Sequence, residues 1–142
     1  MDDELVRAVG ALAFGSRTLE RALEHMTLPQ FRLLSLVATA PERASRLADR
    51  AAVTRPSLTG ILDGLVTRGW VERSDVDGDR RGVTLTITAA GQKAYNNATA
   101  ATTEGLDELI SSADAKTRAK IVAGLVALRT VMQERAERRV SA

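Results

Sequence analysis

The segment from Thr54 to Gly69 carries the signals of one complete α-helix, and it constrains the fold more than any other part of the chain. Thr54 is a suitable N-cap, and Pro56 falls in the first turn, where a missing N–H costs nothing. Gly69 supplies the stop after the last turn. The pattern predicts a helix over about residues 55–68 that buries one apolar face. That face consists of Leu58, Ile61, Leu62, Leu65 and Val66.

The opposite face of this helix is polar and has little bulk, so another surface could approach its backbone closely. Its residues are Arg55, Pro56, Ser57, Thr59, Gly60, Asp63 and Thr67. A shorter helix is predicted just before it, over residues 42–52, with Leu47 and Ala48 facing inward. About three residues are left for the turn between the two helices, which is the spacing of a helix-turn-helix.

A charged hairpin is predicted after the second helix. Trp70–Arg73 and Val83–Ile87 have the composition of strands, and the second alternates apolar and polar residues. Residues 74–82 between them are rich in turn formers and charges, so they are predicted to form the loop. Two tandem helices followed by a charged hairpin predict a winged helix-turn-helix. Its second helix would lie in the major groove of DNA, and its hairpin would reach the flanking backbone or minor groove.

Long helices are predicted on both sides of this unit. A helix capped by Thr27 should end before Pro41, and another should begin after Thr88 and run to a break at residues 111–114. The terminal helices each carry an apolar seam at 4-3 spacing, which is typical of helices that pack on helices. The seam residues are Leu5, Val9, Leu12, Leu19 and Leu23 at one end and Ile121, Leu125, Leu128 and Met132 at the other.

These patterns predict a mainly α-helical fold with a small β-hairpin, in one domain over residues 1–142. Within it, residues 28–91 would form the DNA-binding winged helix-turn-helix. Residues 1–26 and 92–142 would form a helical dimerisation part, because two apolar seams exceed what one small winged domain needs. We therefore expect a homodimer related by a twofold axis. The last residues, Glu134 to Arg139, are predicted to be a solvated tail of mixed charge.

Composition narrows the possible functions. The formal net charge is only +2, but the pI is about 9.5, and most of the 20 basic residues are arginines, whose forked guanidinium groups suit phosphates and guanine edges. The chain has no cysteine, which excludes disulfides and thiolate metal sites. The acidic start at Asp2 and the lack of a long apolar run favour a cytoplasmic protein with no membrane partner.

The segment from Thr27 to Gly91 resembles the multiple-antibiotic-resistance regulator (MarR) family of bacterial transcription factors. The resemblance rests on Leu28-Pro29-Gln30-Phe31, on the stretch 65–73, and most strongly on 75–91, which is similar to that family's wing. It implies a homodimeric regulator, with repression favoured, on a pseudo-palindromic operator of double-stranded DNA. In this family a small, frequently phenolic or otherwise aromatic anion often releases the DNA by entering a cleft between the dimerisation and DNA-binding helices.

The resemblance also implies roles for single residues. Arg81 matches the wing-tip arginine that enters the minor groove, Asp79 matches its acidic partner, and Arg80 lies between them. Recognition-helix contacts to bases or phosphates would come from Arg55, Pro56, Ser57 and Thr59. Arg73 would face a phosphate, although a cross-strand salt bridge is a nearly equal alternative. Arg46 and Arg50 would contact the DNA backbone or simply form a solvated face.

Four residues lie on elements that would line an effector cleft of the family's type: Phe14, Arg17, His25 and Phe31. Arg17 would pair with an effector carboxylate, but core packing and surface placement explain these residues equally well. His25 is the single histidine, and one histidine without cysteines does not build a metal site. We therefore predict neither a metal nor a cofactor.

Two other classes of protein are alternatives to a DNA-binding regulator. An enzyme would need a nucleophile with a base, a metal cluster or a phosphate loop, and the sequence contains no such constellation. A winged helix can also be a protein-interaction module that does not bind DNA. Such a module would give no reason for the charged run Asp79-Arg80-Arg81, and its second helix would carry a more apolar outward face. Salt-dependent binding of duplex DNA distinguishes the two.

Overall fold

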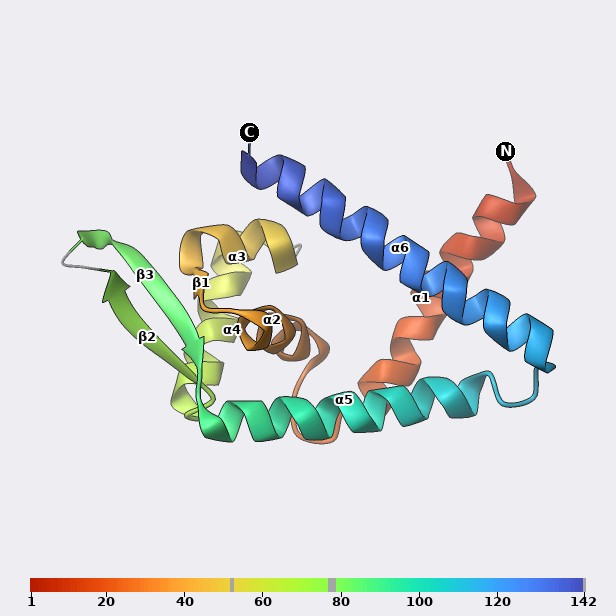
Figure 1. Ribbon diagram of the computed structural model, residues 1–142, viewed down its shortest axis with the longest axis horizontal. Coiled ribbons are helices and arrows are strands. Elements are labelled where there is room, and N and C mark those ends of the chain that lie inside the picture. Colours follow the sequence, from red (N-terminus) through yellow and green to blue (C-terminus); the bar gives the residue numbers. More distant parts are fainter. Residues whose placement is uncertain (52, 77–78, 142) are drawn as a thin grey trace.

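The computed structural model describes residues 1–51, 53–76 and 79–141, which are mostly helical (Figure 1). The predicted mainly α-helical fold with a small sheet is confirmed. The described elements, in chain order, are α1 (Asp3–Ala22), α2 (Leu28–Thr39), β1 (Glu42–Arg43), α3 (Ala44–Ala51), α4 (Arg55–Thr67), β2 (Val71–Val76), β3 (Asp79–Ile87), α5 (Ala89–Leu109) and α6 (Ala115–Ser141).

The sheet has a third strand where the sequence predicted the start of a helix. Glu42 and Arg43 form β1, and α3 begins only at Ala44. The strand order is β1-β3-β2, and β1 pairs antiparallel with β3, with Glu42 opposite Leu85. This pairing supplies backbone partners to the edge of β3 that β2 leaves open. The predicted helix over 42–52 was therefore too long at its start, and its last residue, Ala52, lies outside the described residues.

The hairpin strands are longer than predicted. β2 runs to Val76 and β3 begins at Asp79, so the predicted loop over 74–82 is largely strand, and its centre, Asp77 and Gly78, lies outside the described residues. The register runs from Val71 opposite Ile87 outward, with an irregularity between Asp75 and Val76. Cross-strand pairing of the backbone explains the error, because it overrides the turn preference of Asp and Ser. Figure 1 shows the hairpin projecting away from the helices.

The largest core lies between the helix-turn-helix and the sheet. Leu33, Leu47, Leu65 and Leu85 are fully buried there, and Val71 is almost so. These residues come from α2, α3, α4, β3 and β2 respectively, so one core fixes the wing relative to the tandem helices. A smaller cluster of Leu23, Leu28 and Ala98 joins the end of α1 to α2 and α5.

Local capping explains where α2 and α4 begin and end. The Thr27 hydroxyl accepts a bond from the Gln30 N–H, and the Gln30 side chain accepts one from the Thr27 N–H, which is a capping box. At the end of α4, Gly69 has φ +73°, a left-handed conformation that favours glycine. The Gly69 N–H donates to the Val66 carbonyl and the Trp70 N–H donates to the Leu65 carbonyl, so the predicted stop is a Schellman motif.

The sheet joins α5 through a tight junction. The Thr88 hydroxyl accepts from the Gly91 N–H at 3.0 Å, as predicted for a cap, and donates to the Gly69 carbonyl at 2.5 Å. The Thr88 N–H donates to the Trp70 carbonyl at 3.0 Å. Gly91 is buried, and a Cβ on it would lie 2.0 Å from the Trp70 carbonyl oxygen. Position 91 therefore has no room for a side chain unless the backbone moves.

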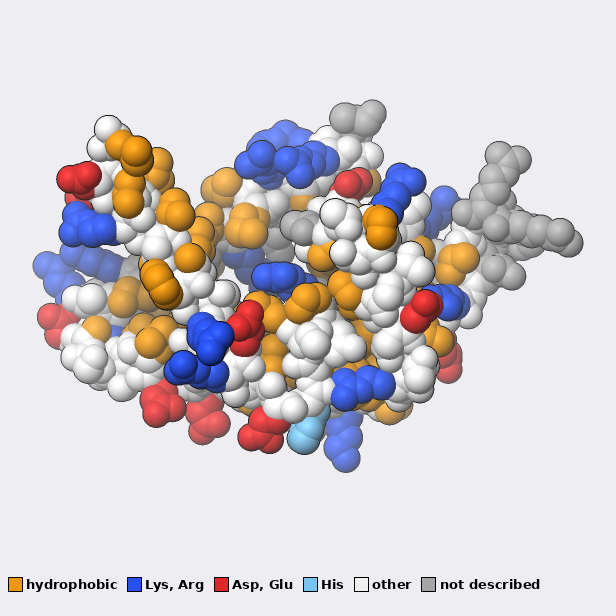
Figure 2. All heavy atoms as spheres, turned by 180° about the vertical axis from the view of Figure 1, so that it is seen from behind, with side chains coloured by type: hydrophobic (Ala, Val, Ile, Leu, Met, Phe, Trp, Pro, Cys, Tyr) orange, Lys and Arg blue, Asp and Glu red, His pale blue; other side chains and the backbone are white. Residues whose placement is uncertain are grey.

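The terminal helices leave apolar side chains exposed. α1 packs on α5 and α6 contacts α3, yet neither α1 nor α6 contains a buried residue. Figure 2 shows hydrophobic side chains along the surface of the projecting helix α1. The predicted seam is exposed on α1 at Leu5, Val9 and Leu12, whereas Leu23, just after the last residue of α1, is buried. The residues exposed on α6 include Val122, Leu125, Val126, Leu128, Val131 and Met132.

α6 starts at a charged cap and is helical to Ser141, through the residues predicted to be a tail. The carboxylate of Asp114 accepts the Thr117 N–H at 2.7 Å, and this bond lowers the pKa of Asp114. Because the pKa is lowered in the folded chain, this bond contributes to stability above the ordinary carboxyl pKa, and the contribution is lost as the pH falls from there through the lowered pKa. No helix among the described residues is long and apolar enough to cross a membrane.

Candidate nucleic-acid interface

The outward face of α4 is exposed and has small side chains, as predicted. Arg55, Pro56, Ser57 and Thr59 are all exposed. Beside them, a Cβ added to Gly60 would meet no atom within 4 Å. A DNA backbone or base edge can therefore come close to this stretch of helix without displacing protein atoms.

The start of α4 combines free donors with positive charge. Thr54 caps the helix by accepting the Ser57 N–H at 3.3 Å, and its hydroxyl donates to the Ser57 hydroxyl at 3.0 Å. Since the Ser57 oxygen is the acceptor in that bond, its own proton is available to a ligand. The exposed Arg55 lies at the positive end of the helix dipole, which adds to the attraction for a phosphate.

Arg73 forms a salt bridge, but with a residue of α4 and not across the hairpin. Its Nη2 atom lies 2.5 Å from Oδ1 of Asp63, so the pair joins β2 to the outward face of α4. The predicted alternative was a cross-strand pair within the hairpin. The pair is exposed, with 43% of the Arg73 side chain and 59% of the Asp63 side chain accessible to solvent. Arg73 thus stays at the surface beside the candidate recognition helix.

Two further arginines near α4 have partners within the chain. The Arg68 guanidinium lies over the Trp70 ring, 4.1 Å from its centroid, a cation–π contact that closes the end of α4. Arg50 on α3 pairs with Glu42 of β1. Arg46, also on α3, is exposed. From the sequence, Arg46 and Arg50 could either contact the DNA backbone or form a solvated face. The ion pair with Glu42 gives Arg50 a structural role.

The wing residues are placed by their backbone. Asp79, Arg80 and Arg81 begin β3, and Asp79 is opposite Val76. The sequence predicted them in the loop, and the longer strand instead puts them at the outer end of the hairpin, where Figure 1 shows the wing projecting. Their predicted roles at the wing tip stay predictions.

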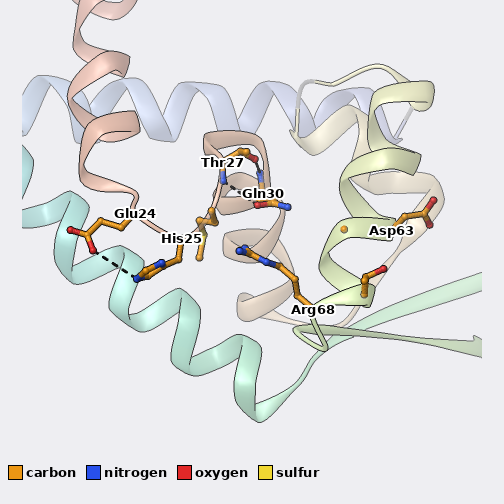
Figure 3. Close-up of a pocket in the computed structure, with 9 residues that line it drawn as sticks. Glu24, His25, Thr27, Gln30, Asp63 and Arg68 are labelled. Carbon is orange, nitrogen blue, oxygen red and sulfur yellow. Dashed lines mark hydrogen bonds and ion pairs between the residues drawn. The ribbon is translucent and has the colours of Figure 1, made fainter.

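A shallow depression of about 790 Å³ separates the connection between α1 and α2 from α4 (Figure 3). In Figure 3 Arg68 lies across it, whereas the Asp63 carboxylate points away from it. His25 is exposed at its edge, with Nε2 3.8 Å from a Glu24 carboxylate oxygen. The described residues that line it are Glu24, His25, Met26, Thr27, Gln30, Asp63, Gly64, Thr67 and Arg68.

The four candidate effector residues are not brought together in one protomer. His25 lines the depression, whereas Phe31 stacks on Tyr95 of α5 with ring centroids 5.8 Å apart. Phe14 and Arg17 are exposed on α1, and 82% of Phe14 is accessible. Phe31 and Tyr95 therefore mark a different place, between α2 and α5, from the depression at His25.

Sequence reasoning placed Asp63 on the outward face of α4 but gave it no role, and it gave Trp70 only a place in a strand. Asp63 and Arg73 are ten positions apart and belong to different elements, so helical or strand spacing does not pair them. The spacing of Arg68 and Trp70 is a weak sequence signal for their cation–π contact, because a cation two residues before an aromatic residue at the end of a helix can fold back over the aromatic ring.

Known proteins are similar to this chain in sequence and in fold. The MarR family model matches residues 26–82, which span α2 to the start of β3. A crystal structure of NadR in complex with 4-hydroxyphenylacetate is 31% identical in sequence, covers 91% of this chain and 89% of its own, and superimposes with a TM-score of 0.65. The chain belongs to the MarR family. The fold of its described residues is accordingly that of a MarR winged helix.

Two other similar proteins bear on the function. A mutant of Escherichia coli MarR, complexed with operator DNA, is 26% identical with a TM-score of 0.71, and the match covers 89% of this chain and 94% of that one. The homoprotocatechuate degradative operon repressor of Escherichia coli is 37% identical over 75 residues, 52% of this chain and 51% of the repressor. The chain thus spans about half the length of this curated relative.

Proposed function

We propose that this MarR-family protein is a sequence-specific, DNA-binding transcriptional regulator that acts as a homodimer on a pseudo-palindromic operator. The observation that carries the proposal is the exposed, small-residue face of α4, with Arg55 at its start and Arg73 beside it. The similarity to a MarR protein in complex with operator DNA supports DNA as the partner. Repression is the favoured sense, because the homoprotocatechuate relative is a repressor.

The exposed apolar residues of α1 and α6 support the homodimer. They lie on two helices that both leave the winged part, and they recur along each helix rather than standing singly. A second copy of the chain would cover them on both helices at once, which a twofold axis makes geometrically self-consistent. Two copies would also present two α4 helices to two half-sites.

A small aromatic anion is the proposed effector class. NadR binds 4-hydroxyphenylacetate, which combines a phenol with a carboxylate. In this chain the stacked rings of Phe31 and Tyr95 lie between α2 and α5, and α1 packs on α5 as well. Phe14 and Arg17 of α1 and His25 remain candidates to line the cleft, either from the same protomer or across the dimer.

Replacement of Arg81 by alanine tests the wing. If Arg81 enters the minor groove, the variant should lose about 1–3 kcal/mol of operator-binding free energy while the dimer stays intact. Fluorescence anisotropy with a labelled operator duplex measures the loss, and sedimentation of the free protein checks the dimer. Lys93→Ala, at an exposed cation on α5, is the matched control and should bind as the parent does. Unchanged operator affinity in Arg81→Ala would show that the wing arginine has no part in binding.

A further inference from the structure

The salt bridge between Asp63 and Arg73 is unusual in its position. Asp63 belongs to the same exposed face of α4 as Thr59 and Gly60, so it places a carboxylate where the proposed function puts DNA phosphates. Asp63 is the one carboxylate within α4, all of whose residues are described, and the cost of a negative charge there is repulsion from the DNA. A residue kept there in spite of that cost needs an explanation.

The geometry gives Asp63 a specific partner. Oδ1 of Asp63 takes one N–H of the Arg73 guanidinium at 2.5 Å, within charge-assisted hydrogen-bond range. A guanidinium has five N–H donors, and the exposed fraction of the Arg73 side chain, 43%, leaves part of the group open to solvent. In Figure 3 the Asp63 carboxylate is turned away from the neighbouring depression, consistent with its pairing toward β2.

We infer that Asp63 is an internal counter-ion for Arg73: in the free protein it neutralises a cation that DNA phosphate would otherwise engage, and so weakens binding to duplexes in general. The inference rests on the proposed function. Phosphate and carboxylate offer the same kind of acceptor to a guanidinium, so a bound duplex competes with Asp63 for Arg73. Asp63 is a positioning residue in this scheme, because it acts on DNA through Arg73.

If Asp63 is a counter-ion for Arg73, replacing it should change the DNA affinity in the opposite direction from the change expected if Asp63 only holds the wing against α4. Replacing Asp63 by asparagine frees Arg73 and removes a negative charge, so DNA binding should become tighter. If Asp63 only braced the wing against α4, losing it would loosen the wing and binding would become weaker. In Asp63→Asn, Arg73 becomes free to contact one DNA phosphate. The slope of log K against log salt concentration, where K is the association constant for DNA, should therefore become steeper by about one. A purely structural role would not change that slope.

The experiment uses the full chain and a random-sequence duplex of about 25 base pairs, so no operator is needed. Binding is measured by fluorescence anisotropy between about 50 and 200 mM salt, the range over which phosphate contacts dominate. The variants are Asp63→Asn, Arg73→Gln and the double variant. Glu72→Gln is the matched control, since it removes the same charge from the next residue on β2, whose side chain points to the other face of the strand. Circular dichroism confirms that each variant is folded.

We expect Asp63→Asn to bind the duplex about threefold to tenfold more tightly at the low-salt end, with a slope steeper by about one. In the Arg73→Gln background the same substitution should lose most of its effect, and Glu72→Gln should leave the slope unchanged. The inference is overturned if Asp63→Asn binds the duplex more weakly than the parent or equally well. It is also overturned if Glu72→Gln gains as much affinity, or if Asp63→Asn gains as much affinity in the Arg73→Gln background. None of these results affects the proposed function. An absence of salt-dependent binding in the parent chain overturns both.

Discussion

Replacing Gly91 by alanine should lower the free energy of unfolding by about 3 kcal/mol, because the added methyl group has no space. Its position would be 2.0 Å from the Trp70 carbonyl oxygen and 2.9 Å from a side-chain carbon of Ile87. The first of these neighbours is backbone and cannot rotate away. The junction must shift, which strains the Thr88 bonds to Gly69 and Trp70.

Thermal unfolding at one fixed protein concentration measures this effect, and a decrease of roughly 6–12 °C in the melting temperature is expected for a chain of this size. Gly60→Ala is the matched control. It also adds one methyl group to a helical glycine, but nothing lies within 4 Å of the new atom. The control should be neutral or slightly stabilising, since alanine is the better helix former. Equal melting temperatures for the two variants would contradict the packing described at the junction.

Replacing Leu125 by glutamate should dissociate the proposed homodimer. Leu125 lies in the apolar seam of α6 and is 41% exposed in the single chain, so the substitution need not disturb folding of the protomer. In a dimer the twofold axis brings two such carboxylates into an apolar interface, where an unpaired charge is costly. We expect the dissociation constant of the dimer to rise at least ~100-fold, about 3 kcal/mol, with a parallel loss of operator affinity.

Sedimentation equilibrium gives the dimer dissociation constant, and anisotropy gives the operator affinity. Gln133→Glu provides the control, because it introduces the same charge at an exposed polar position of the same helix. It should leave both quantities near those of the parent. A Leu125→Glu protein that still sediments as a tight dimer would show that the α6 seam is not part of the interface.

The elements that depend on local signals could be predicted from the sequence. Thr54, Pro56 and Gly69 marked both ends of α4, because capping and left-handed stops are fixed within a few residues of the chain. Thr27 and Thr88 did the same for α2 and α5. Periodicity separated the buried face of α4 from its exposed face, which is the face that the candidate interface uses.

Elements that depend on distant partners could not be predicted. β1 exists because Glu42 lies opposite Leu85, more than forty positions along the chain, and its own composition favours a helix. The outer part of the hairpin is strand because each side pairs with the other, although Ser74 and Asp75 are turn formers. The Asp63–Arg73 pair likewise joins two elements, α4 and β2, whose relative position depends on the large shared core to which Leu65 and Val71 belong.

The most direct test of the central claim is selection of bound duplexes from a random DNA pool at about physiological salt, using protein refolded free of small molecules. Specific binding by such regulators exceeds non-specific binding by ~10³ or more, so a true operator should be enriched. We predict recovery of an inverted repeat whose half-sites are about one helical turn apart. Recovery of no shared sequence above a salt-sensitive background would contradict the assignment as a sequence-specific regulator and would favour a winged-helix module that binds proteins.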